Sequence, residues 1–411
     1  MKILFIGCIC EEKFFYNLVW NSKTIKPSIA GQRFERMIVE GISSESEIEL
    51  LSYIPVSTYP HYPHIICFRK AELIYKGIPV RYIPFLNLPC LKQITILLYT
   101  FWFVLRWLIA NHRIKEKIIF LNVIYPPTAL PSLLLGRLLG CRVVTLVPDI
   151  SSFRFDYSPT TGIFKKYLML FFKRISEWLD RRFDGYVLLT DYMKNIVNPR
   201  NKPYVVVEGM VEDHLRGLKN DISQKHVPPA IMYAGSLRAR YGISKLIKAF
   251  SQMPIRECEL WIFGSGDYVD TIRRVAEEDK RIKYFGTVTH AEVIEYETRA
   301  TLLVNPRPSD EEFTKYSFPS KTLEYMASGT PLLTTPLPGI PSEYKEYIYT
   351  FEDESVEGMS KRMTDILSIP LEELHKFGQR ARWFVMENKN HLVQSKKILY
   401  FLEQLLSNTN K

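Results

Sequence analysis

Short apolar runs alternate with longer amphipathic stretches along the first half of the chain. The apolar runs at residues 2–6, 118–122 and 142–147 predict buried β-strands. The amphipathic stretches at 32–42 and 129–139 predict helices. Strands that alternate with helices of this length form a parallel, doubly wound sheet with right-handed crossovers. The first half is therefore predicted to be an α/β domain.

The second half repeats this alternation. Strands are predicted at 230–234, 259–263, 282–285 and 302–304, with helices at 243–252, 268–278 and 291–299 between them. A charged, irregular stretch from Gly209 to Pro229 separates the two series. We predict an N-terminal domain over residues 1–208 and a C-terminal domain over 209–385. The segment 371–407 is predicted to be helical throughout, with its end (about 386–411) packing back on the first domain.

Residues 302–335 combine a strand, a polar loop, a helix and a second strand. Ser320 at the helix start and Gly329 at its end fit the capping rules. Lys321 lies in the first turn, where its charge opposes the helix dipole, and a bound phosphate would remove that conflict. Glu324, one turn later, can accept hydrogen bonds from sugar hydroxyls. The alternative is an ordinary helix with a surface lysine and glutamate.

Glycine turns follow the successive strands of the second half, and their amides are expected to meet at one edge of the sheet. Small residues let backbone N–H groups approach a pyrophosphate closely. The glycines and the cations that accompany them are Gly235, Gly264, Gly266, Gly286, Arg238, Arg240 and Lys321. Together they predict a site for a nucleoside diphosphate. The spacing matches neither a P-loop nor the glycine pattern of dinucleotide-binding proteins.

Composition agrees with two folded domains and an anionic ligand. The chain has 411 residues, 46% of them apolar and 24% charged, with a formal charge of +10. A basic excess favours phosphorylated small molecules, anionic lipid or nucleic acid as partners. Without a basic tail or a zinc-ligand spacing, nucleic acid is not expected. The six scattered cysteines are predicted to be reduced thiols of a cytosolic protein, and no metal site is expected.

Two apolar segments raise the question of a membrane. Residues 2–6 are followed by Glu11 and Glu12 where a signal peptide would have its cleavage site, so we predict a first β-strand instead. The run from Ile94 to Ala110 is short for a spanning helix and is interrupted by Arg106. It is predicted to be a helix that either rests on an anionic membrane surface or packs inside the domain.

From these motifs the chain resembles the family 4 glycosyltransferases, which are retaining enzymes with the GT-B fold. The resemblance covers nearly the whole chain and is strongest over residues 231–343. In that family the loop after the first strand of the C-terminal domain holds the donor diphosphate with an arginine and a lysine. Gly235 and Gly242 match this loop, while Ser236 and Tyr241 stand at the two basic positions. The nearby Arg238 and Arg240 are the candidate substitutes.

The family's signature has two glutamates eight positions apart around a phenylalanine-glycine turn. Glu324 matches the second, which binds the donor ribose, and Tyr316 occupies the first, which contacts the transferred sugar. Phe318 matches the phenylalanine and Pro319 replaces the glycine. Lys321 is an added cation near the phosphates. The run from Ser317 to Lys321 resembles a subgroup of bacterial surface-polysaccharide transferases.

In the N-terminal domain the family has a glycine-rich acceptor loop, to which Gly31 corresponds. Pro148 stands where the family commonly has a histidine close to the reacting sugar, and Asp149 follows it. Asp149 is the candidate polar group near the acceptor, with structural capping as the alternative.

The resemblance implies two Rossmann-like domains that face a cleft, with the nucleotide sugar on the second domain and the acceptor on the first. It implies transfer with retention and without a metal. The expected catalytic groups are Asp149, Arg238 and Lys321. The expected donor-binding residues are Gly235, Ser236, Arg240, Gly264, Gly266, Val288, Tyr316, Ser317, Phe318, Pro319, Ser320 and Glu324. The expected setting is the cytoplasm, with a peripheral position on the inner face of a bacterial membrane. There the enzyme would act on a lipid-linked or saccharide acceptor in lipopolysaccharide or other surface-polysaccharide biosynthesis.

Two other functions remain open at this point. A sugar-nucleotide 2-epimerase of GT-B fold would need several acid/base carboxylates, and the N-terminal half offers few beyond Asp149. A catalytically weak nucleotide-sugar-binding subunit would fit Tyr316 and Pro148 at two positions of the family pattern.

Overall fold

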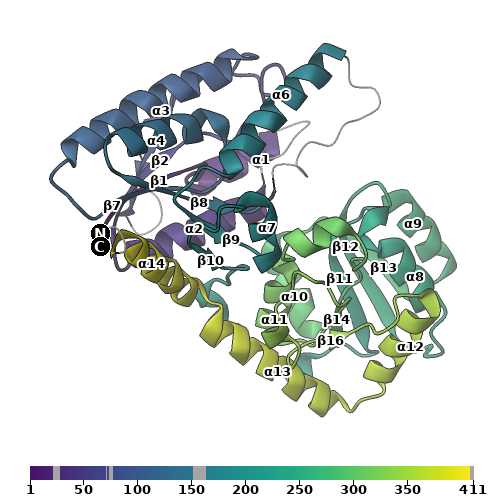
Figure 1. The fold of residues 1–411 in the computed structure, drawn as a ribbon. Coiled ribbons are helices and arrows are strands. Elements are labelled where there is room, and N and C mark those ends of the chain that lie inside the picture. Colours follow the sequence, from purple (N-terminus) through teal and green to yellow (C-terminus); the bar gives the residue numbers. More distant parts are fainter. Residues whose placement is uncertain (22–27, 71, 74–76, 151–162, 408–411) are drawn as a thin grey trace. The chain divides into compact units, whose positions relative to one another are not determined.

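The computed structural model describes residues 1–411 except for 22–27, 71, 74–76, 151–162 and 408–411. The chain forms two compact units (Figure 1). Unit 1 consists of Met1–Met210 with His391–Lys411, and unit 2 consists of Val211–Asn390. Each unit is a parallel α/β sheet covered by helices, as the alternation of apolar runs and amphipathic stretches predicts.

The sheet of unit 1 has eight strands in the order β10-β9-β8-β7-β1-β2-β5-β4. Neighbouring strands run parallel except for the short edge strand β4. The strands are β1 (Lys2–Gly7), β2 (Glu47–Ser52), β4 (Glu72–Leu73), β5 (Pro79–Tyr82), β7 (Lys117–Leu121), β8 (Arg142–Val147), β9 (Gly185–Leu188) and β10 (Tyr204–Val206). A separate two-stranded ribbon pairs β3 (Ile66–Cys67) with β6 (Phe85–Leu86). The central strands β1, β7 and β8 are buried almost throughout, which explains their continuous apolar sequences.

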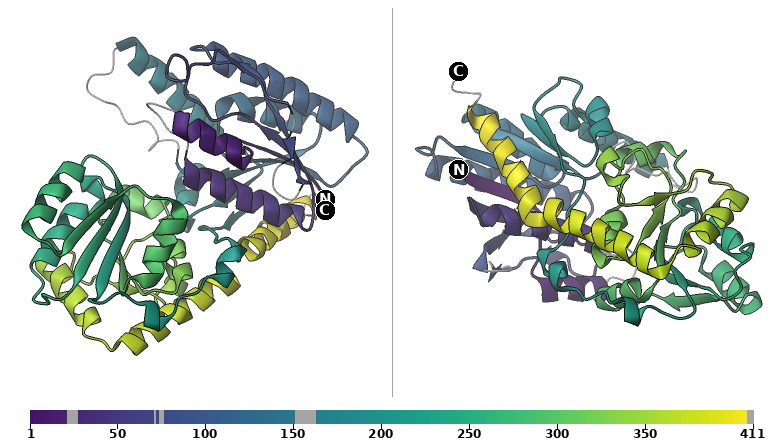
Figure 2. Two further views of the ribbon diagram at one scale, coloured as in Figure 1. Left: turned by 180° about the vertical axis from the view of Figure 1, so that it is seen from behind. Right: turned by 90° about the horizontal axis from the view of Figure 1, so that it is seen from below.

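Helices cover both faces of this sheet, as Figures 1 and 2 show. Right-handed crossovers place α3, α4 and α6 on one face, and α2 with α14 lies on the other. The helices are α1 (Glu12–Asn21), α2 (Ile29–Ser43), α3 (Leu91–Ala110), α4 (Pro126–Leu138), α6 (Ile163–Asp180), α7 (Lys194–Val197) and α14 (His391–Ser407). The C-terminal helix belongs to this unit because α14 packs on α2, with Ser395 against Gly41.

Three local predictions for the helices are wrong. The sequence analysis gave no helix between β1 and residue 32, but α1 occupies Glu12–Asn21. The helix expected from residue 32 begins at Ile29, because Ser28 caps its first turn. The helix expected to be continuous over 371–407 is interrupted at Lys389 and Asn390, where the Asn390 side chain donates to the Met386 carbonyl in place of a helical amide.

Unit 2 has a six-stranded parallel sheet in the order β13-β12-β11-β14-β15-β16. Its strands are β11 (Ala230–Ser236), β12 (Glu259–Ser265), β13 (Ile282–Gly286), β14 (Leu302–Asn305), β15 (Leu332–Thr334) and β16 (Tyr349–Thr350). Its helices are α8 (Ile243–Ser251), α9 (Val269–Glu278), α10 (His290–Arg299), α11 (Ser320–Ser328), α12 (Val356–Leu367) and α13 (Leu371–Asn388). An apolar core fills each side of the sheet. The strand order reverses between β11 and β14, which is where open α/β sheets bind ligands.

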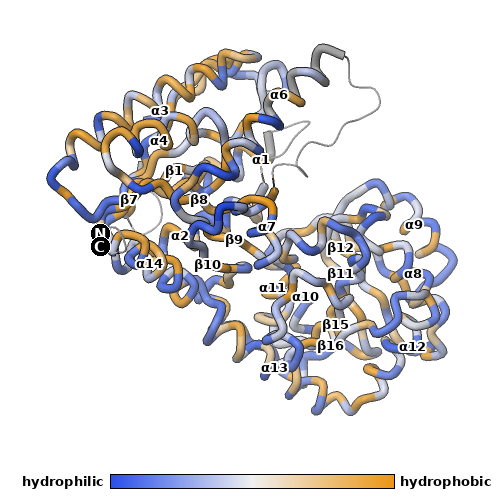
Figure 3. The backbone as a smooth tube through the Cα atoms, in the orientation of Figure 1, coloured by the Kyte–Doolittle hydropathy of each residue, from blue (hydrophilic) through white to orange (hydrophobic). Residues whose placement is uncertain are grey.

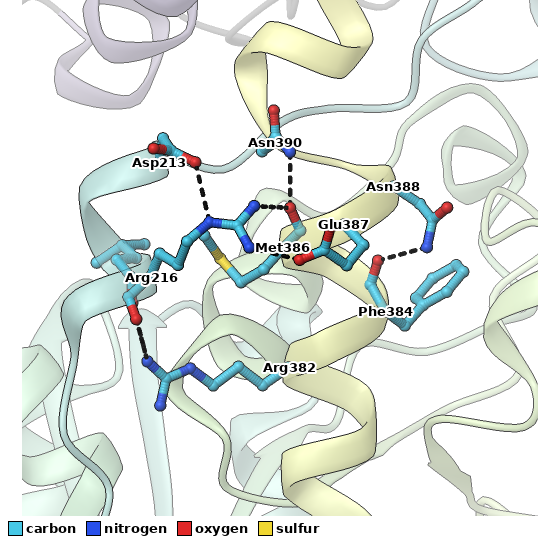
Figure 4. A network of polar contacts seen from close by, with 9 residues as sticks. Asp213, Arg216, Arg382, Phe384, Met386, Glu387, Asn388 and Asn390 are labelled. Carbon is cyan, nitrogen blue, oxygen red and sulfur yellow. Dashed lines mark hydrogen bonds and ion pairs between the residues drawn. The ribbon is translucent and has the colours of Figure 1, made fainter.

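The 3-10 turn η3 (Asp213–Gly217), near the start of unit 2, is fixed to the end of α13 by a polar network (Figure 4). The Arg216 guanidinium pairs with Asp213 and Glu387, and it donates to the Met386 carbonyl at 2.9 Å. Arg382 in turn donates to the Arg216 carbonyl at 3.1 Å. This network ties the irregular stretch after Met210 to unit 2.

Candidate active site

The loops that leave β11, β12 and β14 interlock at the carboxyl edge of the unit 2 sheet. Gly264, at φ +125°, lies so close to β11 that a side chain there would overlap the Gly235 carbonyl oxygen. A side chain at Gly266 would overlap the Leu237 carbonyl in the same way. The Leu237 N–H donates to the Ser265 carbonyl at 2.9 Å. The predicted glycine turns of β11 and β12 therefore form one surface.

Lys321 lies over this surface from the first turn of α11. A Cβ at Gly235 would be 3.0 Å from Lys321 Cε, so the lysine side chain crosses the end of β11. The lysine Nζ is 5.7 Å from the centre of the Tyr325 ring. Tyr325 is fixed to β11, because its hydroxyl accepts from the Ala234 N–H at 2.8 Å and donates to the Ala234 carbonyl at 3.1 Å. The structure thus brings the predicted cation and the first glycine turn together.

The helix starts in this part of unit 2 differ in how they are capped. The prediction that Ser320 caps α11 is wrong: Pro319 is the N-cap residue, and as a proline it provides no capping side chain. The described residues also provide no side-chain cap for α8 or α9. By contrast α10, which follows β13, has a full capping box between Thr289 and Glu292. The uncapped helix starts follow β11, β12 and β14, where backbone N–H groups remain suitable for an anion.

Arg307 is a cation of this site that the sequence analysis missed. It follows β14, and its Nη2 donates to Ser317 Oγ at 3.0 Å. Its guanidinium carbon lies 4.4 Å from the centre of the Phe313 ring. Thr335 Oγ1 donates to the Arg307 carbonyl, which fixes the backbone as well. A sequence signal existed, because an arginine two residues after a buried strand falls at the carboxyl edge of the sheet.

The other basic residues of the β11 loop differ in their contacts, and an aromatic side chain holds Arg240. Arg240 Nη2 donates to the Tyr241 hydroxyl at 3.0 Å. Tyr233, buried below, donates its hydroxyl to the Ser236 carbonyl at 3.0 Å, and burial raises its pKa above the usual value. Arg238 is exposed on the same loop. Arg238, Arg240 and Lys321 therefore lie on loops that meet at one edge, but only Lys321 is held directly over the glycines.

The predicted donor-binding residues of the 316–324 segment have different environments. Tyr316 and Glu324 are half-buried, at the end of η6 (Glu312–Tyr316) and one turn into α11. Phe318 is buried, with its ring 5.6 Å from that of Tyr344, so its side chain is a core anchor. Val288 is half-buried in the loop after β13 and packs against the core.

The predicted acceptor residues are both exposed at the carboxyl edge of the unit 1 sheet. Gly31 lies inside the first turn of α2, and its N–H donates to Ser28 Oγ at 3.0 Å. Asp149 follows β8 and Pro148. Among the described residues, no group of three or more His, Cys, Asp or Glu side chains is placed to hold a metal ion.

The loop after β1 contains a buried polar cluster that the sequence analysis also missed. Glu35 Oε1 accepts from the Cys8 N–H at 2.7 Å, and Oε2 accepts from Cys8 Sγ at 3.2 Å. Gln32 accepts from the Cys10 N–H at 3.0 Å and donates to the Cys8 carbonyl. Burial raises the pKa of Glu35 to about 7. A carboxylate on the buried side of a predicted helix was the available signal.

Residues 218–384 match the family model of the glycosyl transferases group 1. No curated protein sequence is significantly similar to the chain.

Three solved structures are similar over both full chains. Sucrose-phosphate synthase from Thermosynechococcus elongatus is 12% identical, with a TM-score of 0.65 and coverage of 99% of this chain and 100% of its own. The lipopolysaccharide outer core galactosyltransferase WaaB is 13% identical, with a TM-score of 0.63 and coverage of 98% and 99%. HepE from Anabaena, in complex with UDP, is 14% identical, with a TM-score of 0.62 and coverage of 98% and 100%. The chain as a whole has the GT-B fold, and its C-terminal unit matches the glycosyl transferases group 1 family over residues 218–384.

Proposed function

We propose that this glycosyltransferase moves a hexosyl group from a nucleotide-diphosphate sugar to a hydroxyl acceptor, with retention at the anomeric carbon. The observation that carries the proposal is the position of Lys321. Its side chain crosses Gly235 at the uncapped start of α11. A cation, a helix N-terminus and a glycine turn at a topological switch point form a site suited to a diphosphate.

The donor would bind to unit 2 through separate contacts to phosphate and ribose. Lys321 and the amides of the β11 loop and of the α11 start would hold the diphosphate. Glu324, one turn further along α11, would accept hydrogen bonds from the ribose hydroxyls. The structural neighbour HepE has been captured with UDP and with UDP-glucose, which makes UDP the first ligand to test.

In the reaction, the bond between the anomeric carbon and the phosphate oxygen breaks, and the diphosphate leaves with the electron pair. The acceptor oxygen bonds to the same face of that carbon and loses its proton, which a phosphate oxygen of the leaving group can accept. Charge grows on the diphosphate as the bond breaks. Lys321, Arg238 and Arg240 would stabilise that charge, which is usually the largest catalytic contribution.

The acceptor would bind to unit 1, where Gly31 and Asp149 lie at the carboxyl edge of the sheet. We propose a lipid-linked or saccharide acceptor at the cytoplasmic side of a bacterial membrane. Support for a surface-polysaccharide role is the fold similarity to a lipopolysaccharide galactosyltransferase.

A panel of nucleoside diphosphates and nucleotide sugars, screened by thermal shift, tests the proposal. A true donor stabilises the fold by mass action, by about 2.7 kcal/mol at a hundredfold excess over Kd. Release of the nucleoside diphosphate that depends on an added saccharide acceptor would then show transfer. The proposal fails if no nucleotide shifts the melting temperature, or if UDP-GlcNAc alone is converted to its 2-epimer.

A further inference from the structure

Helix α3 of unit 1 is apolar on two opposite sides. One side is buried in the unit: Ile96, Val104 and Trp107 are almost fully enclosed, and Trp107 Nε1 donates to Glu49 Oε1 at 3.0 Å. The other side is exposed at helical spacing. Its large exposed residues are Leu91, Ile94, Leu98, Phe101, Trp102 and Ile109. A helix that is hydrophobic all round is normally buried on every side, so the outer side of α3 indicates a further partner.

Elements that contact α3 carry further exposed apolar side chains. Leu138 is 69% exposed on α4, which packs closely on α3. Ile66 is 71% exposed on the β3–β6 ribbon, and the Leu86 N–H of that ribbon donates to Thr95 Oγ1 of α3 at 3.2 Å. We call these residues of α3, α4 and the ribbon the apolar surface. Figure 3 shows the hydrophobic colouring along α3 and α4.

The chain around the apolar surface is strongly basic. Residues 73–148 contain nine Lys and Arg, of which Lys92 and Lys117 are buried, but a single acidic residue, Glu116. Arg106, on the same helix, lies with its guanidinium carbon 5.5 Å from the Trp102 ring centre. Arg113 and Lys115 follow the end of α3, and both are exposed. Exposed aromatic and aliphatic side chains bordered by cations are typical of a surface that inserts among anionic headgroups.

We propose that the apolar surface rests on an anionic lipid bilayer, with α3 lying in the plane of the headgroups. By length and composition α3 is able to cross a membrane. Crossing would require it to leave the contacts of Ile96, Val104 and Trp107, so the structure favours a helix that lies on the bilayer. A second copy of the chain is a poorer occupant, because it would bring two basic surfaces together. This inference concerns unit 1 and does not depend on the donor site proposed for unit 2.

Flotation of the full-length protein with lipid vesicles tests the proposal. We expect binding to vesicles of phosphatidylcholine with added phosphatidylglycerol, and much weaker binding to phosphatidylcholine alone. The double variant Leu98→Glu/Leu138→Glu should lose at least about tenfold in affinity, because two charges would enter the interface. Arg106→Gln and Arg113→Gln should each cost about fivefold on the anionic vesicles only.

The control is Trp383→Glu, which places a charge at a residue of unit 2 that is 62% exposed, and which should bind vesicles like the unmodified protein. The thermal shift with UDP reports separately on unit 2 and on folding. If the unmodified protein does not float with anionic vesicles, or if the double variant floats equally well, the proposal is overturned. A dimer that the double substitution dissociates, without any vesicle binding, would assign the apolar surface to a second copy instead.

Discussion

In the two units of this glycosyltransferase, side chains of opposite charge lie beside the loop that follows the first strand. After β1, the loop of unit 1 meets the buried carboxylate of Glu35, which accepts from the Cys8 N–H at 2.7 Å. After β11, the corresponding loop of unit 2 meets the ammonium side chain of Lys321. Neither loop has room for a side chain at its glycine: Cβ at Gly7 would overlap Glu35, and Cβ at Gly235 would lie 3.0 Å from Lys321.

This difference supports the proposed diphosphate site on unit 2. In unit 1 the loop amides are already engaged by protein side chains. Glu11 accepts from two amides of the first turn of α1, and Ser28 caps α2. In unit 2 the Lys321 side chain lies beside Gly235, and Pro319 leaves α11 without a side-chain cap. Two sheets of similar topology therefore offer an anion very different environments. What differs is a few side chains that reach the same edge of each sheet.

Replacing Lys321 is expected to have the largest effect among the variants that test this difference between the units. Lys321→Ala removes the charge that would face the leaving diphosphate in the proposed reaction, and we expect kcat to fall by about 10²–10³-fold. The matched control is Lys315→Ala, at an exposed lysine of η6 in the same segment, which should change kcat less than about twofold. Initial rates with saturating donor measure both. Full activity of Lys321→Ala would remove the basis of the proposed function.

Glu35 predicts a pH dependence of stability that belongs to unit 1. Its folded pKa of about 7 lies above the usual 4.5, so the folded protein holds a proton that the unfolded chain releases between these values. The stabilisation from this proton is complete below pH 4.5 and is lost as pH rises to 7. The shift corresponds to about 3 kcal/mol.

The variant Glu35→Gln keeps the hydrogen-bond acceptor for the Cys8 N–H but does not titrate. It should match the unmodified protein at pH 5 and be more stable at pH 8, as measured by urea midpoints at the two pH values. UDP affinity should be the same for both proteins. Parallel pH profiles of the two proteins would show that Glu35 does not carry a raised pKa.

Substitution of Gly264 tests how closely the loops after β11 and β12 approach each other. Gly264→Ala introduces a Cβ that overlaps the Gly235 carbonyl, in addition to the strain of φ +125°. Gly286→Ala is the matched control, because Gly286 also has a positive φ (+75°) but no atom within 4 Å of its Cβ position. We expect Gly286→Ala to cost about 1 kcal/mol and Gly264→Ala about 2 kcal/mol more. Thermal unfolding measures both, and equal losses would contradict the close approach of the two loops.

The sequence predicted the fold well because the central strands of both sheets are largely continuous apolar runs. The boundaries of β11, β12 and β14 agree with the structure to within two residues, since local periodicity determines them. The predicted anion site depended on residues 320–329, where Lys321 lies in the first turn of one short helix and Gly329 is its C-cap residue. Features that lie within a single helix or strand can therefore be predicted from the local sequence.

The missed residues act over longer distances. Glu35 lies 27 positions from Cys8, and only the packing of α2 on the sheet brings the two side chains together. Arg307 reaches Ser317 across a loop whose course the sequence does not specify. Phe318 fits a family motif, but its burial depends on packing against Tyr344, which lies beyond α11 and β15 in the chain. Contacts between residues that are distant in the sequence can be identified only from the tertiary structure.

The smallest effect is expected from making the start of α11 resemble that of α2. Pro319→Ser would install an N-cap side chain like Ser28, which accepts from the Gly31 N–H at 3.0 Å. The new hydroxyl would compete with phosphate for the amides of the first turn, and we expect UDP affinity to fall about threefold. The reciprocal variant Ser28→Ala should cost about 1 kcal/mol of stability and leave UDP affinity unchanged. Calorimetric titration of the two variants with UDP distinguishes the helix starts, and an unchanged affinity in Pro319→Ser would mean that the α11 amides do not contact the nucleotide.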